Sequence, residues 1–166
     1  EKIFKKINDM CKKKNIKFLT MYGQTEASPR MSYLPSHLNS VKKNCIGKAI
    51  SGGRFKLIDN NNKVIDKPNQ VGELIYIGKN VCLGYAKNKN DLNNSDENKG
   101  ILYTGDLAKR DSDYFYYIVG RKKRFLKIFG NRLNLEELEL SLKKRHLQCV
   151  CSGSDKKLKI YFTKKK

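Results

Sequence analysis

The stretch that decides the fold is residues 103–139, which read YTGDLAKRDSDYFYYIVGRKKRFLKIFGNRLNLEELE. Asp106 follows Gly105, and a glycine permits the tight backbone turn that pushes a side chain out of a sheet toward a ligand. An ionised aspartate accepts hydrogen bonds through two oxygens, so it suits a vicinal diol such as a ribose. We therefore predict a ligand-facing carboxylate at Asp106.

Later in the same stretch, the apolar run at residues 114–119 gives way to Gly120 and four consecutive cations at 121–124. Charged side chains are almost never fully buried unless they are paired, so this change marks an exposed junction. We predict that the chain can move at this point.

Upstream of this stretch, the sequence is typical of short β-strands separated by turns. The predicted segments are the strands Arg54–Ile58 and Lys63–Ile65 around the turn Asp59–Asn62, the strand Gly72–Gly78, the solvated loop Asn88–Gly100, and a hairpin made of Leu107–Arg110, Asp111–Asp113 and Tyr114–Val119. Regularly spaced short strands favour a small barrel or sandwich.

The first residues have a mixed character. Apolar residues recur at helical spacing over residues 3–11 and predict an amphipathic helix. Residues 16–21 predict a buried strand that delivers Tyr22–Glu26 at its carboxyl end, where ligands bind in α/β sheets.

After the junction, the pattern changes again. Asn134 is placed to cap a helix whose first turn is acidic and whose last turn is basic, as the helix dipole favours. Two strands follow, at residues 148–152 and 158–163. Helix and strands together predict the beginning of a second, α+β domain.

Length and composition bound the class of protein. With 166 residues and 39% hydrophobic content, the chain is large enough to bury a core. No apolar run approaches the roughly 20 residues needed to cross a bilayer, so we expect no membrane span and a cytoplasmic location. The five cysteines include no C-x-x-C pair, and we predict reduced thiols with neither a disulfide nor zinc.

The net charge of +20 is a common indication of nucleic-acid binding. The lysines, however, are scattered from Lys2 to Lys166 among many asparagines, which indicates a general residue bias rather than a binding patch. We therefore expect nucleic acid not to be a partner. Outside the enzymes, the alternative is a basic module that binds an anionic polymer.

Four motifs occur together. They are Tyr22–Glu26 (YGQTE), Gly72–Gly78 (GELIYIG) with Gly84-Tyr85, Tyr103–Asp106 (YTGD), and Gly120–Glu139 (GRKKRFLKIFGNRLNLEELE). In this order the chain resembles the adenylate-forming superfamily of acyl-CoA synthetases, nonribosomal adenylation domains and luciferases. One motif alone would be a weak signal, but the four together span roughly residues 16–140. The run is most similar to bacterial acyl-CoA synthetases of the AMP-forming type.

The resemblance implies an activity, its cofactors and a role for each site residue. Members of the superfamily use ATP and Mg²⁺ to convert a carboxylic acid to an acyl-adenylate, and then pass the acyl group to a thiol such as that of CoA. The implied nucleotide contacts are Tyr22 on adenine with Gly23 beside it, Thr25 near the α-phosphate, Glu26 on magnesium, and Asp106 and Arg121 at the ribose. The other implied roles are Lys123 as the hinge, Lys127 facing the adenylate and Gly130 lining the thiol channel. Catalytic roles thus fall to Thr25, Glu26 and Lys127.

The resemblance also implies an α+β fold in three parts. Residues 1–119 correspond to the C-terminal part of the large AMP-binding domain with its distorted β-barrel subdomain, 120–124 to the hinge, and 125–166 to the start of the small C-terminal lid domain.

Two pieces of the superfamily pattern have no counterpart in the chain. These are the phosphate loop, expected before Tyr22, and the lysine near the end of the lid. We therefore expect a fragment of an ATP-dependent acid–thiol ligase for a carboxylic acid, in particular a fatty acid, and expect it to be inactive alone. The alternative among enzymes is an adenylation domain that loads an amino acid onto a carrier protein.

Overall fold

The computed structural model describes residues 2–128, 131–154 and 157–162. The chain divides into two compact units, each described by itself below. The first unit comprises Glu1–Thr104 and Ala108–Val119, and the second comprises Gly105–Leu107 and Gly120–Lys166.

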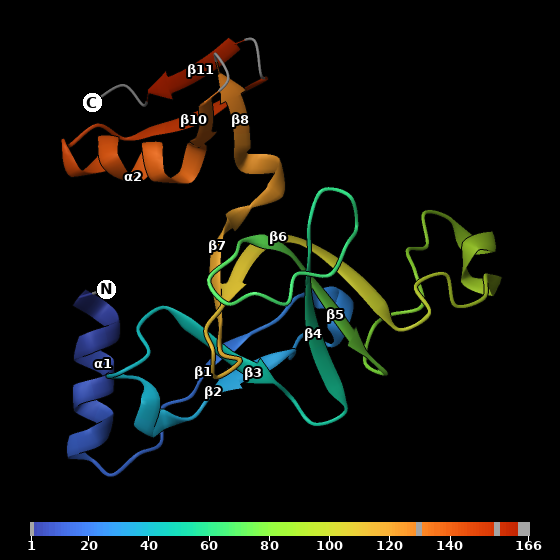
Figure 1. Cartoon of the computed structure of the whole chain (residues 1–166), viewed down its shortest axis with the longest axis horizontal. Helices are drawn as coiled ribbons and strands as arrows, with labels where there is room; N and C mark the ends of the chain where they lie inside the picture. Colours follow the sequence, from blue (N-terminus) through green and yellow to red (C-terminus); the bar gives the residue numbers. More distant parts are fainter. Residues whose placement is uncertain (1, 129–130, 155–156, 163–166) are drawn as a thin grey trace. The chain divides into compact units, whose positions relative to one another are not determined.

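The main sheet has seven strands in the order β1-β2-β3-β7-β6-β5-β4 (Figure 1). The strands are β1 (Thr20–Tyr22), β2 (Ser32–Leu34), β3 (Cys45–Ala49), β4 (Gly53–Ile58), β5 (Gly72–Gly78), β6 (Ile101–Arg110) and β7 (Tyr116–Arg121). The pairs β1–β2, β2–β3, β3–β7 and β4–β5 are antiparallel. Together with the helices, this sheet confirms the predicted mixed α+β class. Among the described strands the order is open, with β1 and β4 at its edges, so the expected barrel is not closed.

The helical elements are few and short. They are α1 (Lys2–Lys13), α2 (Leu135–Lys144) and the 3₁₀ turns η1 (Thr25–Ala27), η2 (Ser36–Leu38), η3 (Lys89–Asn93) and η4 (Lys122–Arg124). Helix α1 confirms the predicted amphipathic helix, and its Phe4 ring lies 5.4 Å from that of Phe18. In the described part of the chain, no helix combines the length and the apolar character needed to cross a membrane.

Aromatic side chains from different strands meet in the core of the first unit. The ring centroid of Phe55 on β4 lies 5.0 Å from that of Tyr116, 5.5 Å from that of Tyr76 and 6.3 Å from that of Tyr22. Such pairs contribute beyond the area that they bury. The buried members of this core are Ala27, Met31, Ile46, Phe55, Leu57, Ile65, Leu74, Tyr76, Val81, Leu102, Ala108 and Tyr116.

The prediction of a buried strand at residues 16–21 is wrong in extent and in burial. Strand β1 begins only at Thr20, and the side chains of Ile16 and Met21 are 55% and 48% exposed. The backbone before β1 has a different partner, since the side-chain amide of Asn39 donates to the Phe18 carbonyl at 2.7 Å. The Asn39 side chain therefore takes the place of the neighbouring strand that the apolar pattern predicted as a hydrogen-bond partner.

The predicted hairpin around residues 59–62 is also only partly correct. The Asp59 carboxylate accepts from the backbone N–H groups of Asn61 and Lys63, so the turn forms. Beyond it, the Ile65 N–H donates to the Leu57 carbonyl at 2.8 Å and Val64 makes a β-bridge to Ile58, while β4 also pairs along its whole length with β5. The sequence identified the strand and its hairpin neighbour, but residues 63–65 form a β-bridge rather than a full strand.

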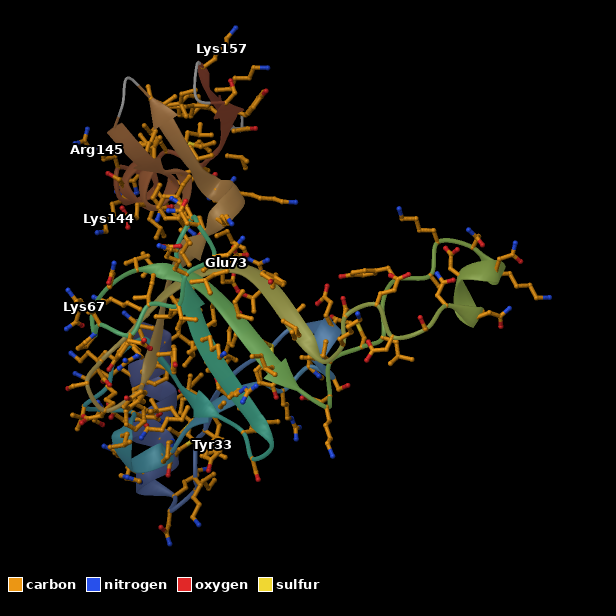
Figure 2. All side chains as sticks on the ribbon, turned by 45° about the vertical axis from the view of Figure 1, so that its right-hand side comes forward. Tyr33, Lys67, Glu73, Lys144, Arg145 and Lys157 are labelled. Carbon is orange, nitrogen blue, oxygen red and sulfur yellow. The ribbon has the colours of Figure 1, made fainter. Side chains whose placement is uncertain are left out.

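The second unit packs helix α2 against a pair of small hairpins. Strands β8 (Phe125–Ile128) and β9 (Asn131–Asn134) pair with each other, as do β10 (Cys149–Ser154) and β11 (Lys157–Phe162). The predicted cap is confirmed, because the Asn134 side chain accepts from the Glu136 N–H at 3.0 Å. Exposed cations lie at the carboxyl end of the helix, at its last residue Lys144 and at Arg145, which suits the helix dipole (Figure 2).

An ion pair and its hydrogen bonds connect η4, α2 and β10 in this unit. The Arg124 guanidinium lies 2.6 Å from the Glu139 carboxylate on α2, and it also donates to the Cys151 carbonyl at 2.9 Å. The same Glu139 oxygen accepts from the Cys151 N–H at 2.6 Å. That backbone hydrogen bond, followed by the contact with Arg124, holds the pKa of Glu139 below its ordinary value of 4.5.

We predict that Glu139→Gln destabilises the second unit by roughly 1–2 kcal/mol near neutral pH, because two hydrogen bonds to a charged group are weakened. The folded pKa is the lower one, so the contribution is complete above the unfolded pKa and is lost as the pH falls through the folded value. Denaturant unfolding at about pH 7 and about pH 3, with the exposed Glu137→Gln as control, measures this. Equal losses at both pH values would contradict it.

Candidate functional site

The candidate site begins with the loop between β1 and β2, residues 23–31. Its first residue must be glycine, because a Cβ at Gly23 would lie 1.3 Å from the Pro29 carbonyl oxygen. The loop then forms the 3₁₀ turn η1 and reaches Ser28, which has a left-handed φ of 57°. A residue other than glycine is strained in the left-handed region of backbone angles. The loop therefore needs contacts from other segments of the chain to stabilise this conformation.

One such contact connects three distant segments. The Gln24 side-chain amide donates to the Thr104 carbonyl at 2.9 Å, and the buried Thr104 hydroxyl donates to the Leu74 carbonyl at 2.7 Å. Gln24 belongs to YGQTE, Leu74 to GELIYIG and Thr104 to YTGD. Three of the four motifs therefore meet through hydrogen bonds in the first unit.

A second group of contacts comes from the segment after β5. The Cys82 N–H donates to the Glu26 carbonyl at 2.8 Å. The Tyr85 hydroxyl donates to the Glu26 carboxylate, and this hydrogen bond is the main cause of a raised pKa for Tyr85. The Ser28 hydroxyl donates to the Asn80 carbonyl at 3.2 Å. The loop thus lies against residues 80–85, at the start of the long segment between β5 and β6 that carries η3 (Figures 1 and 2).

The side chain of Asn80 is at the centre of these contacts. Its Nδ2 donates to the carbonyls of Ala27 at 2.6 Å and Arg30 at 3.0 Å, and its Oδ1 accepts from the Tyr76 hydroxyl at 2.8 Å. Tyr76 is fully buried. The loop is therefore connected through one amide to the core of the sheet.

Two glycines make room for this tyrosine. A Cβ at Gly53 would lie 2.3 Å from the Tyr76 hydroxyl oxygen, and one at Gly78 would lie 2.8 Å from it and 2.7 Å from Asn80 Oδ1. Gly53 and Gly78 face each other across β4 and β5. The glycine that ends GELIYIG is thus explained by packing.

In the second unit, Asp106 pairs with Arg121. The Arg121 Nε lies 2.7 Å from Asp106 Oδ1, and the aspartate side chain is 5% exposed whereas that of the arginine is 57% exposed. Gly105 has a φ of +69° with open space around its Cβ position, so the backbone conformation alone requires glycine there. The left-handed backbone conformation expected at Gly105 is present, but it lies within strand β6 rather than in a turn.

The remaining predicted residues are placed as follows. Tyr22 is half-buried against the aromatic core, Thr25 is exposed at the start of η1, and Lys123 is exposed within η4. Lys127 lies on β8 with a side chain outside the described part, and Gly130 lies outside the described residues.

A metal ion bound at Glu26 would have few other protein ligands. In the described ranges, no three His, Cys, Asp or Glu side chains gather closely enough to hold an ion. Mg²⁺ commonly binds one or two carboxylates and completes its shell with water and substrate phosphates. The Glu26 carboxylate therefore suits magnesium that arrives with a nucleotide.

Sequence reasoning missed Gln24, Asn80 and the role of Tyr85. Gln24 and Tyr85 lie within motifs already noticed, so their position was a signal. Asn80 gave none, because asparagine is frequent throughout this chain and its two partners in the loop are about 50 residues away.

A sequence model of the AMP-binding enzyme family matches residues 1–86, which is more than half of the chain. The chain belongs to this family. Within it, the chain is 31% identical over 157 residues to the medium-chain fatty-acid–CoA ligase of Escherichia coli (strain K12), covering 93% of this chain and 28% of the ligase. It is 35% identical over 121 residues to the probable 4-coumarate–CoA ligase 1 of Dictyostelium discoideum, covering 73% of this chain and 22% of that protein.

A solved structure has the same fold. Unliganded o-succinylbenzoate coenzyme A synthetase (MenE) from Bacillus subtilis matches with a TM-score of 0.72 and 25% identity, over 95% of this chain and 35% of that one. The same synthetase in complex with ATP and magnesium ion matches with a TM-score of 0.70 and 22% identity, over 93% and 33%. The chain thus spans about a third or less of the family members that it matches.

We predict that Gly78→Ala destabilises the first unit by roughly 1–3 kcal/mol, as overpacking of a tight core does. The new methyl would meet Asn80 Oδ1 and the buried Tyr76 ring, neither of which can move cheaply. Denaturant unfolding measures the change. Gly84→Ala is the control, because the nearest atoms to its methyl belong to the Glu97 side chain, whose carboxylate end can shift. Equal effects of the two changes would contradict the packing argument.

Proposed function

We propose that the protein containing this chain is an ATP-dependent acid–thiol ligase. It activates a carboxylic acid as an acyl-adenylate with release of pyrophosphate, and then transfers the acyl group to CoA. The observation that carries this proposal is the meeting of three motifs of an AMP-binding enzyme through Gln24, Thr104 and Leu74. Surface charge alone would not bring these motifs together.

The first unit supplies groups of the right chemistry for a metal-bound nucleotide. We assign the half-buried Tyr22 to the adenine face, the Thr25 hydroxyl to the α-phosphate and Glu26 to magnesium, as the motif positions imply. Gly23 allows the backbone to fold closely beside them. Bound Mg²⁺ would neutralise charge on the phosphates. The chain's own contribution is to hold the nucleotide in a geometry that allows in-line attack.

The second unit supplies a matched pair of charges. We assign Asp106 to the ribose hydroxyls, with Arg121 beside it. The short contact between these side chains supports the assignment, since the arginine fixes the orientation of the carboxylate. We assign Lys127 to the adenylate and Gly130 to the thiol channel from their motif positions alone.

We also propose that residues 120–124 form a hinge centred on Lys123, between a large domain (1–119) and a lid that begins at 125. Two observations support this. A boundary between the compact units falls between Val119 and Gly120, and Lys123 is exposed in a single 3₁₀ turn between β7 and β8. Hinges are a few such residues that absorb a change in φ and ψ.

For the acid, we propose a fatty acid. The support is that the medium-chain fatty-acid–CoA ligase covers 93% of this chain, more than the 73% covered by the 4-coumarate–CoA ligase. We propose CoA as the acceptor because both of these relatives are CoA ligases.

The test is to incubate the full-length protein with ATP, Mg²⁺ and a panel of fatty acids, 4-coumarate, o-succinylbenzoate and amino acids. We expect acid-dependent ATP–pyrophosphate exchange and acyl-CoA formation with a fatty acid, and loss of both when EDTA removes the metal. Exchange with amino acids only would assign the protein to carrier loading. The absence of exchange with every acid would refute the proposed reaction.

We predict that Asp106→Ala in the full-length enzyme raises the KM for ATP on the order of 10- to 100-fold. A hydrogen bond to a charged acceptor contributes about 1.5–3 kcal/mol, and each 1.4 kcal/mol is a factor of ten. The matched control is Asp113→Ala, an exposed carboxylate in the turn before β7. Unchanged ATP kinetics in a folded Asp106→Ala enzyme would remove Asp106 from the site.

A further inference from the structure

The loop that carries Thr25 and Glu26 has an unusual feature at Ser28. This residue has a left-handed φ of 57° although it is not glycine. Its position lies between the two carbonyls, those of Ala27 and Arg30, to which Asn80 donates. The amide therefore joins the two sides of the strained residue, and the loop cannot straighten without breaking one of these hydrogen bonds.

The orientation of the Asn80 amide follows from its partners. Backbone carbonyls only accept hydrogen bonds, so the group that faces Ala27 and Arg30 must be the NH₂. The oxygen then faces the Tyr76 hydroxyl, which donates to it. Both N–H bonds of the amide are used, and its oxygen is held by a fully buried side chain. No other orientation satisfies all three contacts.

We propose that Asn80 is a positioning residue for the metal–nucleotide site. It holds the loop in the conformation that presents Thr25 and Glu26, and it does so from the sheet core through Tyr76. The proposal rests on the proposed function for the roles of Thr25 and Glu26. The proposal gives a role to Asn80, which is not among the motif residues already assigned to the site.

A positioning role makes a different prediction from a role in stability alone. Asn80 and Tyr76 belong to one chain of contacts, but only Asn80 touches the loop. Loss of the tyrosine hydroxyl leaves both loop contacts in place, whereas replacement of the NH₂ by oxygen sets a carboxylate against two carbonyls. The two changes should therefore differ in ligand affinity even where they lower stability equally.

The experiment uses the full-length protein and compares four variants. Asn80→Asp keeps the acceptor for Tyr76 and removes both donors, and Asn80→Ser keeps one donor. Tyr76→Phe removes the remote partner, and Asn94→Ala removes an exposed amide whose partner is Glu97 on the segment that carries η3. The readouts are the Kd for MgATP by titration calorimetry and the hydrogen exchange of the backbone amides of residues 24–28, 30 and 31.

We expect Asn80→Asp to weaken MgATP binding roughly tenfold or more and to speed exchange in the loop, because two hydrogen bonds are lost and a carboxylate faces two carbonyls. Asn80→Ser should fall between this variant and the wild type, Tyr76→Phe should change the Kd less than about threefold, and Asn94→Ala should match the wild type. If Asn80→Asp does not fold, the comparison of Asn80→Ser with Tyr76→Phe carries the same test.

Three results would overturn the proposal. They are a wild-type Kd in a folded Asn80→Asp or Asn80→Ser protein, equal losses of affinity in the Asn80 variants and Tyr76→Phe, and no MgATP binding by the wild type. The readouts need no acid and no CoA. Failure of every acid in the panel, with the expected Kd pattern intact, would therefore count against the proposed reaction and in favour of the positioning role.

Discussion

Three hydrogen bonds to one planar amide are the constraint on which the candidate site depends. The Asn80 side chain joins a fully buried tyrosine to two carbonyls of an exposed loop. Functional groups are held accurately when the residues behind them are themselves locked by packing. The loop gains the rigidity of β5 in this way, although it contains only one 3₁₀ turn of its own.

The chain has 36 basic and 16 acidic residues, so basic side chains outnumber their possible acidic partners. Acidic side chains connect distant segments, as Asp106 does with Arg121 and Asp111 with Lys42 at 2.7 Å. Burial, together with the hydrogen bond that Tyr117 donates to Asp111, raises the pKa of Tyr117 to about 12, so this tyrosine stays neutral beside the carboxylate.

The parts of the fold that depend on local sequence could be predicted. The glycine before Asp106, the cap at Asn134 and the amphipathic pattern of α1 each depend on neighbours within a few residues, and each is present. The extent of strand pairing could not be predicted. Strand β4 makes only a bridge to its hairpin neighbour at residues 63–65 but pairs along its whole length with β5, and periodicity does not distinguish the two.

The same limit applies to the site. The motifs located Gln24 and Tyr85 without revealing what they bind, since their partners are set by the meeting of distant segments. Asn80 is the extreme case, because an asparagine after a strand most often indicates a turn. Its three partners become apparent only when the loop and the sheet are seen together.

The facing glycines of β4 and β5 also fix how these two strands align. The Tyr76 ring occupies the space that side chains at Gly53 and Gly78 would fill. A shift of one residue would reverse the faces of the strand, and a shift of two would bring Phe55 opposite Gly78, in the space that the ring requires. The observed alignment places both glycines around one ring. Glycine normally weakens a strand, but here two glycines and an aromatic ring hold β4 and β5 in register.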